Sequence, residues 1–294
     1  MNKLIPLVAL ALPLAASAQV TTLLNETFAA DQRTTLNNPA GAQWFSSAGG
    51  SNVVQVDGTS LTQNTGGSGR HLLGYFTPAG AATALARQES LNLSFTVTFN
   101  RATPLNDQGN NFRFGLFDST HGARMTADSH GGTNTTAPTP FDHYTGYAVM
   151  LNLGGADGTN TSIRERTVTT GQGLIGTVGA YTALGSNGPS FTLAPNTAYS
   201  GSLSFTRTQN DELDIAFALE GDLITGFSLA LTDDSPSFDF DTVVFQMGSG
   251  AADGFTLSQV KIDHSAIPEP STTAALMGAG ILGLALLRRR PHNA

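Results

Sequence analysis

Apolar and polar residues alternate with a period of two along most of this chain. Residues 91–99 show the pattern clearly, because Leu, Phe and Val alternate there with Asn, Ser and Thr. A period of two places the apolar side chains on one face of a strand and the polar side chains on the other. The pattern therefore predicts a strand with one buried face and one face in water.

The same alternation predicts further strands, and it accounts for most of the chain between the two ends. About a dozen short strands joined by turns favour two stacked antiparallel sheets, a jelly-roll-like sandwich. No window of ten or more residues in this part carries a helical stripe, so the predicted fold class is all-β. The other predicted strands cover residues 23–28, 53–56, 71–76, 112–116, 147–153, 163–168, 202–206, 213–219, 224–231, 242–247 and 255–262.

The N-terminal residues have the composition of a secretion signal. Lys3 precedes an apolar stretch at residues 4–15, and Ala16 and Ala18 frame a cleavage site of small residues. A charged start, a short apolar run and small residues are typical of a signal peptide, and the run is too short to span a bilayer. We therefore expect signal peptidase to remove residues 1–18 and to leave a β-sandwich domain at residues 19–266.

The C-terminal segment, residues 267–294, contains three parts in a fixed order. The uncharged run at residues 272–287 has sixteen residues, roughly 24 Å as a helix, a little short of a comfortable bilayer span. We expect a single transmembrane helix with its basic end in the cytoplasm. The short motif before this run is Pro268, Glu269 and Pro270, and the basic end after it is Arg288, Arg289 and Arg290.

This order of parts resembles the PEP-CTERM sorting signal of Gram-negative bacteria. The resemblance implies that an exosortase-type membrane protease recognises the tail and removes it. It also implies export through the inner membrane to the cell envelope, the cell surface or the extracellular matrix. The alternative is a plain C-terminal anchor that is never cut.

Composition limits the partners of the domain. The chain has a formal net charge of −8, so nucleic acid is a poor partner. It contains no cysteine, so an exported protein of this size must be held together by its core without disulfides. Charged residues make up only 12% of the chain, whereas glycine occurs 33 times, a composition that suits short strands and turns.

The order of the strand motifs resembles the concanavalin A-like lectin/glucanase superfamily. The segments that carry this resemblance are residues 24–28, 112–118, 147–149, 202–219 and 254–262. The resemblance implies that the first and last strands pair. It also implies either a non-catalytic carbohydrate-binding protein or a carbohydrate-active enzyme, a glycoside hydrolase or polysaccharide lyase.

The sharpest enzymatic feature is the pair Glu212 and Asp214. Two residues apart on a strand, they share one face, and they match the first two positions of the glucanase strand motif. Ala216 and Phe217 stand where the third carboxylate of that motif should be. A retaining mechanism needs a second carboxyl group that can donate a proton, so we expect no catalytic residue here and keep Glu212 and Asp214 as the alternative.

Metal binding is suggested most by the acidic segment at residues 233–241. Asp233, Asp234, Asp239 and Asp241 offer the oxygen ligands that calcium prefers, although they lack EF-hand spacing. We expect no obligatory cofactor and keep structural calcium as an option at these aspartates. The histidines of the irregular stretch 119–143 match no tight ligand motif; they are His121, His130 and His143.

Carbohydrate binding requires aromatic faces and polar groups in a groove. Tyr144 and Tyr181 lie in or beside the two long irregular stretches, 119–143 and 171–195, and Trp44 is the only tryptophan. These three are the candidate ligand-binding aromatics, and such long stretches are expected to be functional or mobile. Together the patterns predict an exported, surface-sorted, non-catalytic protein that is a structural, adhesive or carbohydrate-binding component of an extracellular polysaccharide matrix.

Overall fold

The described part of the chain is built from strands. The computed structural model describes residues 18–29, 44–49, 54–65, 69–101, 112–129, 139–153, 161–176, 178–185, 188–189, 193–221, 224–248 and 252–266, except for the side chains of 224–226. Within these ranges there are seventeen strands and one short 3₁₀ helix, η1 (Val178–Ala180). The predicted all-β class is therefore confirmed.

The terminal segments predicted from the sequence lie outside the described residues. These are the signal peptide up to residue 17, with Ala16, and the tail from residue 267, with its Pro-Glu-Pro motif, apolar run and arginines. Ala18 is described, and it is exposed directly before the first strand. Among the described residues, no helix is long and apolar enough to cross a membrane.

The first sheet contains both ends of the described chain. Strand β17 (Gly254–Ala266) lies at its centre, paired with β7 on one side and with β4 and β1 in turn on the other. All these pairings are antiparallel. The order across the sheet is β14 (Ile224–Asp233), β13 (Leu213–Gly221), β12 (Ala198–Arg207), β7 (Ser90–Asn100), β17, β4 (Leu61–Asn64) and β3 (Val54–Val56), with β1 (Gln19–Glu26) beside β17.

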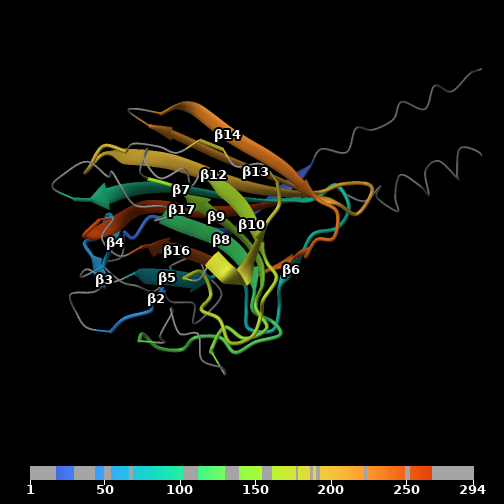
Figure 1. Ribbon diagram of the computed structural model, residues 1–294, viewed down its shortest axis with the longest axis horizontal. Helices are drawn as coiled ribbons and strands as arrows, with labels where there is room; N and C mark the ends of the chain where they lie inside the picture. The colour runs from blue at the N-terminus through green and yellow to red at the C-terminus, as the bar shows by residue number, and fades with distance from the viewer. Residues whose placement is uncertain are drawn as a thin grey trace, which may run out of the picture.

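The second sheet is packed against the first. The order across the second sheet is β11 (Tyr181–Ala183), β10 (Ser162–Arg166), β9 (Thr145–Leu151), β8 (Phe112–Asp118), β16 (Thr242–Met247), β5 (Arg70–Tyr75) and β2 (Phe45–Ser46). In Figure 1, β14, β13 and β12 of the first sheet lie above β8, β16 and β5 of the second. A separate two-stranded ribbon joins β6 (Thr83–Ala84) to β15 (Asp239–Phe240).

The space between the sheets is filled by the inward residues of the alternating strands. Phenylalanine rings from both sheets meet there, with ring centroids 4.8 Å apart for Phe95 and Phe114 and 4.9 Å apart for Phe99 and Phe112. These are edge-to-face contacts, which add to the stabilisation from burial alone. The predicted alternation therefore identifies the inner face of β7, β12 and β13 correctly.

The outer face of the second sheet is also buried, which the alternation did not predict. A second hydrophobic cluster covers it, and this cluster includes Met125, Phe141, Leu174 and Ile175 from the two long irregular stretches. The described parts of these stretches contribute a packed layer over the central strands, which are buried on both faces. Their role as functional or mobile segments stays a prediction.

The first and last strands pair, as the superfamily resemblance implies. Gln19 lies opposite Ala266, and the pairing continues to Glu26 opposite Val260. The two ends of the domain therefore lie side by side. Residues 19–266 contain every described strand and both hydrophobic clusters.

Replacing Phe114 with alanine should destabilise the sandwich by about 3–5 kcal/mol. Its ring is fully buried and contacts the rings of Phe95, Phe217 and Phe245. Urea unfolding of the 19–266 domain measures the loss. The control is Val20→Ala, at a side chain that is 61% exposed, which should change the free energy of unfolding by less than about 0.5 kcal/mol. Equal effects of the two substitutions would contradict this view of the core.

Candidate functional site

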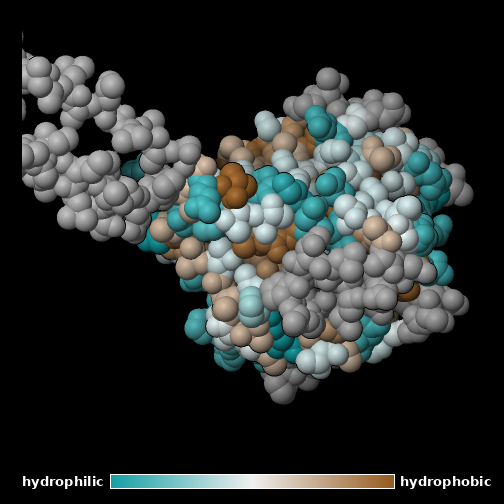
Figure 2. Space-filling view, turned by 180° about the vertical axis from the view of Figure 1, so that it is seen from behind, coloured by the Kyte–Doolittle hydropathy of each residue, from teal (hydrophilic) through white to brown (hydrophobic). Residues whose placement is uncertain are grey.

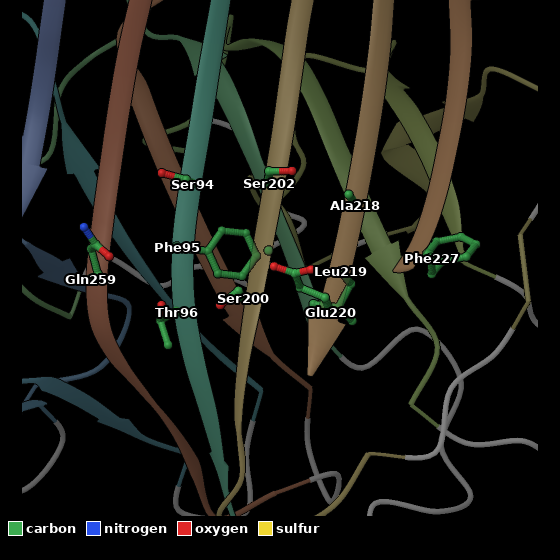
Figure 3. A pocket seen from close by; sticks show the side chains of 11 residues that line it. Ser94, Phe95, Thr96, Ser200, Ser202, Ala218, Leu219, Glu220, Phe227 and Gln259 are labelled. Atoms are coloured by element: carbon green, nitrogen blue, oxygen red, sulfur yellow. The ribbon is translucent and has the colours of Figure 1, made fainter. Parts of the chain in front are cut away.

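A shallow groove of about 340 Å³ lies on the outer face of the first sheet. It crosses five neighbouring strands, from β17 through β7, β12 and β13 to β14, and Figure 3 shows the side chains that line it. Most of its lining is polar or small. The lining residues are Ser94, Phe95, Thr96, Ser200, Gly201, Ser202, Ala218, Leu219, Glu220, Phe227 and Gln259.

The groove follows from the polar half of the strand alternation. On β7 and β12 the outward residues are small, with Ser94 and Thr96 beside Ser200 and Ser202. Short side chains on the two middle strands leave a low floor. The longer side chains of Glu220 on β13 and Gln259 on β17 stand on either side of this floor.

Glu212 and Asp214 lie outside the groove. Asp214 is exposed on β13 and accepts a hydrogen bond from Thr232 at 2.7 Å, and half-exposed Glu212 lies just before the strand. Neither residue lines the groove, whose one carboxylate is Glu220. A glucanase-type cycle needs two carboxyl groups about 5–5.5 Å apart, and the groove lining offers one.

The three candidate aromatics are part of the core. Trp44 is 1% exposed, Tyr144 is fully buried and Tyr181 is 6% exposed. The Tyr144 hydroxyl is hydrogen-bonded to the Tyr75 hydroxyl and donates to the carbonyl oxygen of Ala123. The Tyr181 hydroxyl donates to the carbonyl oxygen of Leu174. The expectation that these rings offer a face to a ligand is therefore corrected, because apolar neighbours cover them.

The four aspartates of the candidate calcium segment point to different partners. Asp233 accepts a hydrogen bond from the Tyr147 hydroxyl, and buried Asp241 accepts one from the Arg124 guanidinium. Asp234 and Asp239 are exposed. No group of three or more metal-binding side chains occurs in the part of the chain that the structure describes. Of the loop histidines, His143 is exposed, His121 lies 4.0 Å from Asp118, and His130 is outside the described residues.

Asp241 holds the covering layer on the second sheet, a role that the sequence did not indicate. Its carboxylate accepts hydrogen bonds from the Ser119 backbone at 2.8 Å, from the Arg124 guanidinium at 2.7 Å and from the Thr242 hydroxyl at 2.6 Å. Arg124 also lies over the ring of Tyr75 at 4.4 Å. The buried charge is thus paired and hydrogen-bonded, as burial requires, and it fixes the residues that follow β8.

A buried hydrogen bond joins the two sheets. The Tyr147 hydroxyl of β9 donates to Asp233 at the end of β14, over 2.7 Å, and accepts from the Ser237 backbone at 3.0 Å. Burial raises the pKa of the Tyr147 hydroxyl well above its usual range. Burial, and then the nearby charge of Asp233, also raises the pKa of Glu165, which lies opposite Tyr147 on β10.

The family comparison identifies the tail. Residues 266–290 match the family model described as the PEP-CTERM protein-sorting motif. The resemblance seen in the sequence is therefore confirmed for this segment. No curated protein matches the chain with significant sequence similarity.

Solved structures similar to this chain include several lectins. A lectin from Bauhinia forficata in complex with GalNAc is 9% identical, with a TM-score of 0.43, covering 85% of this chain and 98% of that chain. Lectin II from Ulex europaeus is 8% identical, with a TM-score of 0.47 and coverage of 83% and 97%. A Lotus tetragonolobus seed lectin is 10% identical, with a TM-score of 0.44 and coverage of 85% and 100%. The two-sheet sandwich itself is established by the strand order of this chain.

Replacing Asp241 with asparagine should cost about 2–3 kcal/mol, because the partly buried Arg124 guanidinium and the Ser119 hydroxyl lose their charged acceptor. Urea unfolding measures the loss, and hydrogen exchange should become faster at the backbone amides of residues 119–125. Asp214→Asn is the matched control at an exposed aspartate. A uniform rise in exchange across both sheets would instead mean that Asp241 supports the whole core and not this layer in particular.

Replacing Glu165 with glutamine should raise stability relative to the wild type above about pH 5. The pKa of Glu165 in the folded protein is raised above 4.5, so the native state binds the proton more tightly than the unfolded state. Wild-type stability therefore falls as pH rises through the window above 4.5, and glutamine removes this fall. Urea midpoints between pH 4 and 8 test the sign, and a difference that stays constant across this range would contradict it.

Proposed function

We propose that this protein is exported, sorted to the cell surface and non-catalytic. We further propose that it is a structural, adhesive or carbohydrate-binding component of the extracellular polysaccharide matrix. The observation that carries this proposal is the sorting motif at residues 266–290, which indicates export and sorting to the surface of a Gram-negative cell. The motif begins where β17 ends, at Ala266, so the delivered cargo is the β-sandwich.

The partners follow from the two ends of the chain. Signal peptidase would act before Gln19 and an exosortase-type protease near Pro268, and the C-terminal segment would hold the precursor in the membrane until then. Gln19 and Ala266 lie opposite each other, so the two tethers leave the domain at one place. The remaining surface of the sandwich is then free to face outward from the membrane.

The surface supports binding more than catalysis. The groove on the outer face of the first sheet offers four side-chain hydroxyls, one amide and one carboxylate, beside the apolar Phe95, Ala218, Leu219 and Phe227. Such groups can form hydrogen bonds to sugar hydroxyls. Figure 2 shows the surface seen from behind, where hydrophobic areas are small and interspersed with hydrophilic and neutral residues. A surface of this kind suits a hydrated polysaccharide better than a large apolar partner.

A glycan array with the purified 19–266 domain tests this function. We expect binding to at least one polysaccharide without release of shorter products, and the same binding in millimolar calcium and in EDTA. Calcium-dependent binding would instead support a metal site at Asp233, Asp234, Asp239 and Asp241. Release of products that Glu212→Gln or Asp214→Asn abolishes would establish the alternative, a glycoside hydrolase or polysaccharide lyase. Absence of binding to any glycan would contradict a carbohydrate-binding role.

A further inference from the structure

We propose that the groove on the first sheet binds an uncharged glycan that lies across the strands, with Gln259 and Glu220 as its specificity-determining residues. This inference rests on the proposed function and assigns it a place and a ligand class. Four polar residues form one row across the sheet, because Gln259 lies opposite Thr96, Thr96 opposite Ser200, and Ser200 opposite Glu220. With strands about 4.8 Å apart, the row is about 14 Å long.

Gln259 reaches this row only because β17 contains a β-bulge. Phe255 and Leu257 point into the core, so simple alternation would turn residue 259 inward as well. The register shifts between Leu257 and Gln259, and Ser258 and Gln259 are both exposed. Val260 and Ile262 then return to the core. Bulges often change the direction of a side chain next to a functional site. This bulge turns the Gln259 amide outward, so that it forms one end of the row.

Glu220 marks the other end of the row beside a second irregularity. The pairing of β13 with β14 shifts register between Leu219 and Gly221, so Glu220 has no regular partner on β14. Its side chain is exposed and lines the groove. The two middle strands, β7 and β12, pair without any shift from Ser90 to Thr98. The two long polar side chains therefore stand at the two irregular positions, with a regular floor between them.

The floor is supported from below by an aromatic ring. Gly201 on β12 lies opposite Phe95, and a Cβ at Gly201 would approach the Phe95 Cζ atom to 2.2 Å. The ring therefore occupies the space that a side chain at residue 201 would fill. An aromatic ring packed over a cross-strand glycine fixes the register and stiffens the sheet at that point. The outer surface above it is lined by Ser94, Ser200 and Ser202.

The charges of the lining select an uncharged ligand. Serine and threonine hydroxyls and the Gln259 amide both donate and accept hydrogen bonds, whereas the Glu220 carboxylate only accepts. None of the eleven lining residues is a lysine, arginine or histidine. A uronic acid or a sulfated sugar would meet Glu220 with no cation among the lining residues, on a chain whose net charge is −8. Lys261, which lies opposite Ser94 at one side of the groove, is already paired with Asp263 at 2.7 Å. Neutral sugar hydroxyls complement the row instead.

Titration calorimetry of the 19–266 domain with neutral and acidic polysaccharides tests the proposal. The neutral probes are a soluble β-glucan, galactomannan and dextran, and the acidic probes are alginate and pectate. We expect at least one neutral probe to bind and both acidic probes to fail. Glu220→Gln and Gln259→Ala should each weaken binding about tenfold, since each removes polar contacts to the ligand. Ser200→Arg, which fills the centre of the groove, should abolish binding.

Ser204→Arg is the matched control, on the same strand and the same face but outside the groove lining. It should leave binding unchanged, and the thermal midpoints of all variants should show that they are folded. Neutral-glycan binding that survives Ser200→Arg would overturn the groove assignment and leave the proposed function intact. Preference for alginate would overturn the ligand class. A dimer by light scattering that Ser200→Arg converts to a monomer would identify a second copy of this chain as the occupant.

Discussion

The central strands of the second sheet are buried on both faces, and the rest of the structure is arranged around the need to cover both. Strand β16 is buried along its full length, and β9 is buried at every position after its first residue. One face is covered by the first sheet, and the other by chain segments between strands. The hydrophobic effect makes exposure of either face of these central strands costly, so neither face is open to a ligand there. The open sheet surface is therefore the outer face of the first sheet.

Covering a sheet with irregular segments creates a second requirement, because their backbone groups lose water. Buried arginines meet this requirement: Arg166 donates to the carbonyls of Phe141 and Tyr144, and Arg113 donates to that of Ile175. Burial lowers the pKa of both guanidinium groups. Together with Asp241 on the other side of the layer, these charges fix the segments in place. The covering layer is thus held by apolar contacts and by buried polar contacts at once.

Strand β17 ends where the sorting motif begins and also contributes Gln259 to the groove on the first sheet. It pairs with β1 at the end from which both terminal segments leave, and it carries the bulge that turns Gln259 outward. It is also hydrogen-bonded to β7 along nearly its whole length. The strand that ends at the sorting motif therefore also forms one side of the proposed glycan groove. Removal of the tail after Ala266 would leave this strand, and hence the groove, unchanged.

The sequence by itself determined the all-β class, the inner faces of β7, β12 and β13, and the identity of the tail. These are local properties, since a period of two and a short motif need no knowledge of distant contacts. Only the tertiary structure decided where Trp44, Tyr144 and Tyr181 lie, because an aromatic residue in an irregular segment has the same sequence pattern whether it is buried or exposed. It also decided the place of Gln259, since a bulge reverses the alternation without a local signal. The polar row from Gln259 to Glu220 depends on register across four strands, which the order of residues along any one of them does not specify.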